Sequence, residues 1–175
     1  MSFLLIIVFA FISFMLGRYL NTVLNLIKGK RNRIKKKKEE IDFNNKKYNF
    51  KGSDDLKMVF LVRQDLKMKA GKIAAQVAHA ALGLYDDIIF GDNKYQQEAL
   101  DFWVNYGQKK IVLKVPDLKV MNDALEKCKA AKIQYCMITD AGCTQIPPGS
   151  KTVLGIGPDT SEKINKITGT FKLMH

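Results

Sequence analysis

Hydrophobic and polar residues follow a repeating pattern along the chain after residue 55. Short apolar runs rich in β-branched residues predict strands at 56–63, 109–115, 133–140 and 152–158. Apolar positions spaced three and four residues apart predict helices at 71–90, 93–107, 116–131 and 159–168. Because strands and helices alternate, we expect an α/β sandwich with helices on both faces of one small sheet.

Residues at the ends of the predicted helices support these boundaries. Gly107 is a suitable C-cap for the second helix, and Pro116 is suited to the first turn of the third. Asp159 or Thr160 is the expected N-cap of the last helix.

The helix predicted at 71–90 carries an apolar face and a polar face. Spacings of three and four residues place Ile73, Val77, Ala80 and Leu84 on the packing face. A neighbouring face carries Lys72, Gln76 and His79. Lys72 lies in the first turn, where the helix dipole favours an anion, so a lysine there would suit a bound phosphate. The alternative is a solvated lysine, with Gln76 and His79 as ordinary polar residues satisfied by backbone.

The segment after the third predicted strand, "TDAGCTQIPPGSKT", contains the other candidate polar groups. Ligands bind beyond the carboxyl ends of strands in open α/β sheets, which directs attention to Asp140, Thr144 and Gln145. Asp140 could act as a general base or position a nucleophile together with Thr144, or it could simply form an Asx turn at "DAG". Cys143 matches no known Cys and His arrangement with His79, which favours a bystander cysteine.

Two glycine-containing segments do not match nucleotide-binding motifs. "GSKT" at 149–152 lacks the Gly-Lys pair of a P-loop and leads into a predicted strand. "GIGPDT" lacks the third glycine of a dinucleotide fingerprint. Neither segment predicts a nucleotide cofactor.

Composition separates the amino-terminal third from the rest of the chain. Of a net charge of +12, residues 1–52 contribute +9 (12 Lys and Arg, 3 acidic residues), and residues 53–175 contribute +3 (17 against 14). The total of 175 residues suits one globular domain with an appendage. Three cysteines without a CxxC pair and two histidines favour neither a disulfide framework nor a metal site, so we expect no metal or cofactor.

The chain begins with 17 uncharged residues, and after Arg18 a second uncharged stretch continues to Ile27. This length predicts a transmembrane anchor at 1–27. A cleaved signal peptide is the alternative, although a charged n-region and a cleavage motif are missing. The basic segment that follows predicts a cytosolic linker at 28–55, and RNA or lipid binding is the alternative for it. The folded domain is then expected at 56–175.

Three motifs in this order, "GKIAAQVAHAA", "DAGCTQIPPGSKTVLGIGP" and "ITGTFKL", resemble those of the type 2 peptidyl-tRNA hydrolase family of archaea and eukaryotes. The resemblance extends from about Leu56 to Leu173. It implies a three-layer α/β sandwich around a small mixed four-stranded sheet, a homodimer, and hydrolysis of the ester that joins a peptide to tRNA. Eukaryotic members often carry a mitochondrial outer-membrane anchor, which segment 1–27 resembles, and we favour that membrane over the endoplasmic reticulum.

The resemblance also assigns roles to individual residues. The implied catalytic residues are Lys72, Asp140 and Thr144, and the implied substrate-binding residues are Gln76, His79, Lys110, Gln145 and Thr152. Lys72 would hold the 3′ end of tRNA or stabilise developing negative charge, while Asp140 and Thr144 would orient water. The alternative function is a membrane-tethered adaptor that uses the same fold without catalysis.

Overall fold

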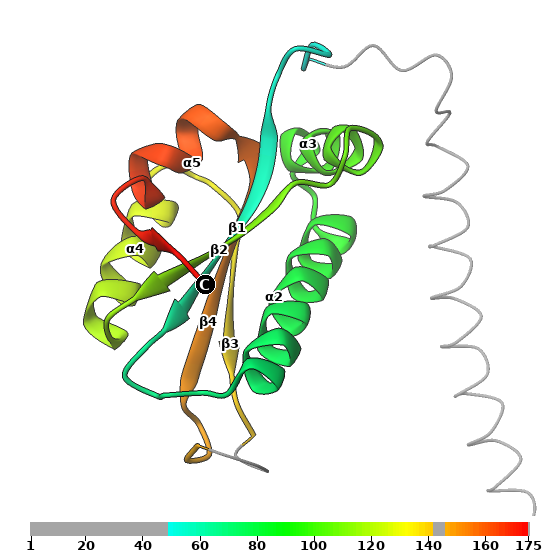
Figure 1. Cartoon of the computed structure of the whole chain (residues 1–175). Coiled ribbons are helices and arrows are strands. Elements are labelled where there is room, and N and C mark those ends of the chain that lie inside the picture. The colour runs from blue at the N-terminus through cyan, green and yellow to red at the C-terminus, as the bar shows by residue number, and fades with distance from the viewer. Residues whose placement is uncertain (1–48, 142–145, 175) are drawn as a thin grey trace, which may run out of the picture. The chain divides into compact units, whose positions relative to one another are not determined.

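The computed structural model describes residues 49–141 and 146–174, and the strands in this part of the chain form one mixed five-stranded sheet in the order β3-β4-β1-β2-β5. The strands are β1 (Leu56–Arg63), β2 (Lys110–Val115), β3 (Tyr135–Thr139), β4 (Lys151–Thr160) and β5 (Lys172–Leu173). β1 and β2 are parallel, whereas β4 is antiparallel to both β1 and β3. The strands β1, β2 and β3 therefore end at the same edge of the sheet, where β4 begins (Figure 1).

The described helices cover both faces of this sheet: α2 (Ala70–Phe90), α3 (Lys94–Asn105), α4 (Leu118–Ala130) and α5 (Ser161–Thr168). One core contains buried residues of α2 and α3 packed against the sheet, including Leu84, Phe102 and Phe60. A second core joins α4 and α5 to the other face through Met121, Ile164 and Leu61. Figure 1 shows the two helix pairs on opposite sides of the strands, which confirms the expected α/β fold.

Several details differ from the sequence-based expectations. The sheet has five strands and not four, because β5 pairs with the outer edge of β2 although it contains two residues, too few to show a periodic pattern. The third helix begins at Leu118, after Pro116, and its N-cap is Asp117, which accepts a hydrogen bond from the Val120 N–H. The expected transmembrane helix at 1–27 lies outside the described residues.

Part of the segment assigned to the linker packs against the domain. Phe50 is 8% exposed, and its ring lies 5.5 Å from the ring of Tyr95 and 5.6 Å from that of Phe102. Asn49 also bonds to Glu98 on α3. The folded region described by the structure thus includes residues just before Leu56.

Two glycines allow α2 to approach the sheet closely. A Cβ atom on Gly83 would lie 2.5 Å from Sγ of Cys136 on β3, and one on Gly155 would lie 2.9 Å from Cδ1 of Leu84. Any larger residue at either position would collide with its neighbour. This close packing holds α2 against the β3–β4 pair.

We expect Gly83→Ala to lower the free energy of unfolding by about 1–2 kcal/mol, because the new methyl group overpacks against Cys136. In a Cys136→Ala background the sign should reverse, since alanine is favoured over glycine in a helix by about 1 kcal/mol. Urea unfolding of the four variants measures both effects. The control is Gly71→Ala, because a Cβ there meets nothing within 4 Å. If Gly83→Ala and Gly71→Ala stabilise the protein equally, the close approach of residue 83 to Cys136 does not affect the free energy of unfolding.

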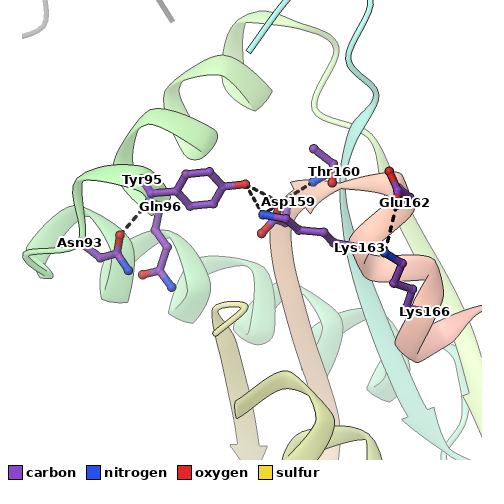
Figure 2. A network of polar contacts seen from close by, with 8 residues as sticks. All are labelled: Asn93, Tyr95, Gln96, Asp159, Thr160, Glu162, Lys163 and Lys166. Atoms are coloured by element: carbon purple, nitrogen blue, oxygen red, sulfur yellow. Dashed lines mark hydrogen bonds and ion pairs between the residues drawn. The ribbon is translucent and has the colours of Figure 1, made fainter. Parts of the chain in front are cut away.

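A buried carboxylate links α3 to the end of β4 (Figure 2). The side chain of Asp159 is 4% exposed, and its Oδ1 accepts hydrogen bonds from Tyr95 Oη at 2.8 Å and from the Thr160 N–H at 2.7 Å. Lys163 donates to Tyr95 Oη at 2.6 Å and forms an ion pair with Asp159 at 3.3 Å. The network satisfies the charge of a carboxylate that solvent hardly reaches.

The network of Tyr95, Asp159 and Lys163 predicts a loss of stability at alkaline pH. Burial raises the pKa of Tyr95 above its usual 10.0, and Asp159 adds to this against the opposing effect of Lys163. Burial lowers the pKa of Lys163, but its hydrogen bond to Tyr95 and the charge of Asp159 outweigh burial and raise the pKa above 10.5. Because both folded-state pKa values are raised, this stabilisation is fully present below about pH 10 and is lost as pH rises through the raised values.

We expect Tyr95→Phe to cost about 1–3 kcal/mol at pH 7, since Asp159 loses a donor, and to flatten the decline of stability between pH 9 and 11. Chemical unfolding across this range provides the measurement. Tyr85→Phe serves as the matched control, because Tyr85 is 43% exposed. An alkaline decline identical in both variants would contradict the assignment to Tyr95.

Candidate active site

A lysine and an aspartate that are 68 positions apart meet at the sheet edge where β3 ends. Lys72 lies in the first turn of α2, and Asp140 directly follows β3. The Lys72 Nζ lies 2.5 Å from Asp140 Oδ1, and the two side chains are 11% and 6% exposed. The structure thus brings the predicted cation and carboxylate together in an almost buried ion pair.

Gln76 extends this pair by one helical turn. Its Nε2 donates to Asp140 Oδ1 at 3.0 Å, while its Oε1 accepts from the Thr152 Oγ1 at 2.5 Å. Because the amide is engaged at both ends, its orientation is determined by its partners. Two donors, an ammonium and an amide, therefore converge on the same carboxylate oxygen.

The position of Thr152 depends on an irregularity between β3 and β4. Ile138 pairs with Val153 and Thr139 with Lys151, so Thr152 is an extra residue on β4. Such a β-bulge redirects a side chain relative to regular alternation. Here the Thr152 hydroxyl points toward α2 and reaches Gln76. The next residue, Val153, packs in the core on the same side of the sheet, so the usual alternation of side chains is interrupted at this point.

The backbone of Asp140 is held as firmly as its side chain. Its N–H donates to the Ser150 carbonyl at 2.8 Å, and its carbonyl accepts from the Gly149 N–H at 2.8 Å. Gly149 has φ +79°, a conformation that glycine adopts without strain. These two backbone hydrogen bonds were not expected from the sequence, although the turn residues "PPGS" before β4 could have indicated them.

An open depression of about 450 Å³ lies beside the ion pair. Gln76 and His79 line it from α2, and residues 137–141 line it from the end of β3. This volume is within the range of small-ligand sites. His79 is exposed and faces this depression, as its spacing from Gln76 predicts. Thr144 and Gln145 follow in the chain but lie outside the described residues.

Lys110 is not brought to this cluster. It begins β2, beside Met58 near the start of β1, and so lies at the opposite end of the sheet from Asp140. Its Nζ sits 4.5 Å from the centre of the Trp103 ring and donates to the Gln108 carbonyl at 3.0 Å. These contacts stabilise the start of β2.

The described cysteines are not activated nucleophiles. Burial raises the pKa of Cys128 to about 12, and burial with the charge of Asp87 raises the pKa of Cys136. Both are therefore neutral thiols at pH 7. Within the described residues, no group of three or more His, Cys, Asp or Glu side chains could hold a metal ion. The chemistry of the cluster is that of a carboxylate, an ammonium group and neutral hydrogen-bonding groups.

Comparison with known proteins identifies relatives that share this domain. Residues 56–174 match the family model described as peptidyl-tRNA hydrolase PTH2. A "Peptidyl-tRNA hydrolase" of Sulfurisphaera tokodaii is 50% identical over 118 residues, which cover 67% of this chain and 98% of the relative. "Peptidyl-tRNA hydrolase 2, mitochondrial" of Bos taurus and that of Homo sapiens are each 45% identical over 121 residues, 69% of this chain and 65% of each relative. The chain therefore belongs to the PTH2 family of peptidyl-tRNA hydrolases.

Proposed function

We propose that the chain hydrolyses the ester bond of peptidyl-tRNA at the depression beside Asp140, releasing free tRNA and the peptide. The family match and the relatives named peptidyl-tRNA hydrolase support the reaction. The observation that carries the location is the convergence of Lys72 and Gln76 on the carboxylate of Asp140. The protein is accordingly a hydrolase.

The proposed mechanism uses the charges of this cluster. Asp140 orients a water molecule and accepts its proton as the water oxygen attacks the ester carbonyl carbon. Lys72 donates to the oxygen on which negative charge develops, as positioned cations do in acyl transfer. The tetrahedral intermediate then collapses, the carbon–oxygen bond to the ribose breaks, and the ribose oxygen receives the proton that Asp140 took from water, which restores the carboxylate. We assign Thr144, which is not among the described residues, to the orientation of the same water.

The remaining polar residues are assigned to substrate binding. His79 is exposed at the depression and can contact the 3′-terminal nucleotide, with Gln145 proposed as a further contact from the loop after β3. Gln76 and Thr152 are proposed to act together. The Thr152 hydroxyl donates to the amide oxygen of Gln76, and the amide nitrogen of Gln76 donates to Asp140. Lys110 receives no role here, since it lies at the opposite end of the sheet.

The adaptor alternative is not favoured. An adaptor does not require a nearly buried carboxylate that is held by a lysine and a glutamine, and such a group is costly to maintain. The decisive experiment incubates the whole chain with N-acetyl-aminoacyl-tRNA and follows the release of free tRNA over several turnovers. Multiple turnover supports the hydrolase, whereas binding of the substrate without release would support the adaptor.

We further propose that residues 1–27 anchor the protein in the mitochondrial outer membrane, with the basic linker that follows and the hydrolase domain on the cytosolic side. The support is the long uncharged segment followed by basic residues, and the mitochondrial names of the mammalian relatives. A chain that lacks residues 1–27 should move from the membrane fraction to the soluble fraction. A full-length chain that is already soluble in cells would contradict the anchor.

Pairing of two copies is proposed as well. Leu82, Tyr85 and Phe90 on α2 are 64%, 43% and 52% exposed, so a partner could cover apolar surface there. Sedimentation of the domain should give twice the mass of one chain, and Leu82→Glu should shift it to the mass of one. A single-chain mass for the unmodified domain would contradict the dimer.

A further inference from the structure

Positive charge is concentrated at the end of the sheet that holds the proposed active site. This end comprises the carboxyl ends of β1, β2 and β3, the segments that follow them, the start of β4, and β5. It contains Arg63, Lys67, Lys69, Lys72, Lys114, Lys119, Lys151 and Lys172 against Asp65, Asp117 and Asp140, 8 basic and 3 acidic residues. The rest of the described residues has 10 basic and 11 acidic residues. The excess charge of the described domain is therefore located at this end.

The acidic residues at this end are already engaged within the protein. Asp65 forms an ion pair with Arg63, Asp117 caps α4, and Asp140 binds Lys72. They cannot neutralise Lys114 and Lys172 without giving up these contacts. An anion from solution or from a ligand would balance the charge of these two lysines.

Two of these lysines form a like-charged pair across neighbouring strands. Lys114 on β2 and Lys172 on β5 are Cα partners in an antiparallel ladder, so their side chains leave the sheet on the same side. Lys114 is half-buried and Lys172 is exposed, and neither side chain makes a hydrogen bond or ion pair with any residue in the described part of the chain. Like charges directly opposite one another destabilise a strand pair. An anion between the two ammonium groups would remove this cost.

The pair lies on the same side of the sheet as α2. Leu113, which precedes Lys114 on β2, is buried in the core under α4 and α5. Because side chains alternate along a strand, Lys114 lies on the other face. Three strand spacings separate β2 from β3, so the pair is roughly 15 Å from the end of β3, where Asp140 lies. The connection from the end of β1, which lies between β2 and β4 in the sheet, to the start of α2 carries Lys67 and Lys69, both exposed. Lys69, Lys67, Lys114 and Lys172 therefore belong to the same end of the sheet as Asp140, and we call these four lysines the basic track.

We propose that this basic track binds the phosphate backbone of the tRNA beside its 3′ end, with Lys114 and Lys172 holding one phosphodiester group between them. The inference rests on the proposed function, because it is the ester at Asp140 that brings the RNA backbone to this end of the sheet. Lysine contacts with phosphate position a nucleic acid without reading its bases. The track thus allows the enzyme to act on peptidyl-tRNAs that differ in sequence.

The test compares two double variants of the whole chain, solubilised in detergent. Lys114→Gln/Lys172→Gln removes the pair. Lys94→Gln/Lys127→Gln removes two exposed lysines that do not lie at the end of the sheet that holds the proposed active site. For N-acetyl-aminoacyl-tRNA we expect the first variant to raise KM about tenfold with little change in kcat, and to reduce the dependence of log(kcat/KM) on log[salt] by about 1. The second variant should match the unmodified chain in both. Lys114→Arg/Lys172→Arg should retain most of the affinity, because it keeps both charges.

A second substrate separates this inference from the proposed function. N-acetyl-aminoacyl-adenosine has the ester but no phosphate, so both Gln variants should hydrolyse it as the unmodified chain does. If the unmodified chain hydrolyses neither substrate, the proposed function fails. If it hydrolyses both and the two Gln variants are alike on tRNA, the phosphate contact is overturned. Loss of binding to phosphatidylserine vesicles by the Lys114/Lys172 variant, with unchanged KM for tRNA, would assign the pair to lipid and also overturn the inference.

Discussion

Asp140→Asn is expected to lower kcat for peptidyl-tRNA hydrolysis by about 10²- to 10⁴-fold, the usual contribution of a general base. Asparagine has the same shape and can keep one oxygen near Lys72 and Gln76, but it cannot accept a proton from water. KM should change much less than kcat, because the depression and the exposed His79 remain. Single-turnover release of tRNA with excess enzyme measures the chemical step directly.

The control for this variant is Asp123→Asn, which removes an exposed carboxylate from α4. It should hydrolyse the substrate at the unmodified rate. Thermal melts of both variants establish that each is folded at the assay temperature. An Asp140→Asn enzyme with more than a tenth of the normal kcat would exclude Asp140 as the base and leave it a structural role.

Lys72→Met is expected to lower the free energy of unfolding by about 3–5 kcal/mol, because it leaves the buried Asp140 carboxylate without its cation. The double variant Lys72→Met/Asp140→Asn should be more stable than Lys72→Met, since the uncompensated charge is then gone. Urea unfolding of both single variants and the double variant yields the coupling energy, which we expect to be about 1–3 kcal/mol.

Lys119→Met provides a matched comparison for Lys72→Met. Lys119 also lies in the first turn of a helix, but it is exposed. Its removal should alter stability by less than about 0.5 kcal/mol. Equal stabilities of the Lys72→Met and Lys119→Met proteins would show that the ion pair contributes nothing to the fold.

The main features of the site were predictable from local patterns. Spacings of four and three residues placed Lys72, Gln76 and His79 on one helix face, and the structure places Gln76 and His79 in the lining of one depression. The rule that ligands bind beyond strand ends directed attention to Asp140, which the structure brings to Lys72. The helix face was predictable because helical periodicity is a local property, whereas Asp140 was located only by a general rule for α/β sheets, and its contact with Lys72 joins residues 68 positions apart.

Other features depend on pairing between distant segments, which local patterns do not reveal. The strand β5 contains two residues and exists through its bonds to β2. The bulge that directs Thr152 toward Gln76 arises from the register between β3 and β4. The position of Lys110 follows from the parallel alignment of β1 and β2, which places the start of β2 far from the end of β3.

The position of β4 has a consequence for the synthesis of the protein. This strand pairs with both β1 and β3, yet it follows both in the chain and contributes Thr152 to the site. On the ribosome, β1 and β3 therefore emerge before the strand that must come between them, and the sheet is completed late in translation. Throughout that period the growing chain is itself a peptidyl-tRNA, and its proposed active site is completed only once β4 has joined the sheet.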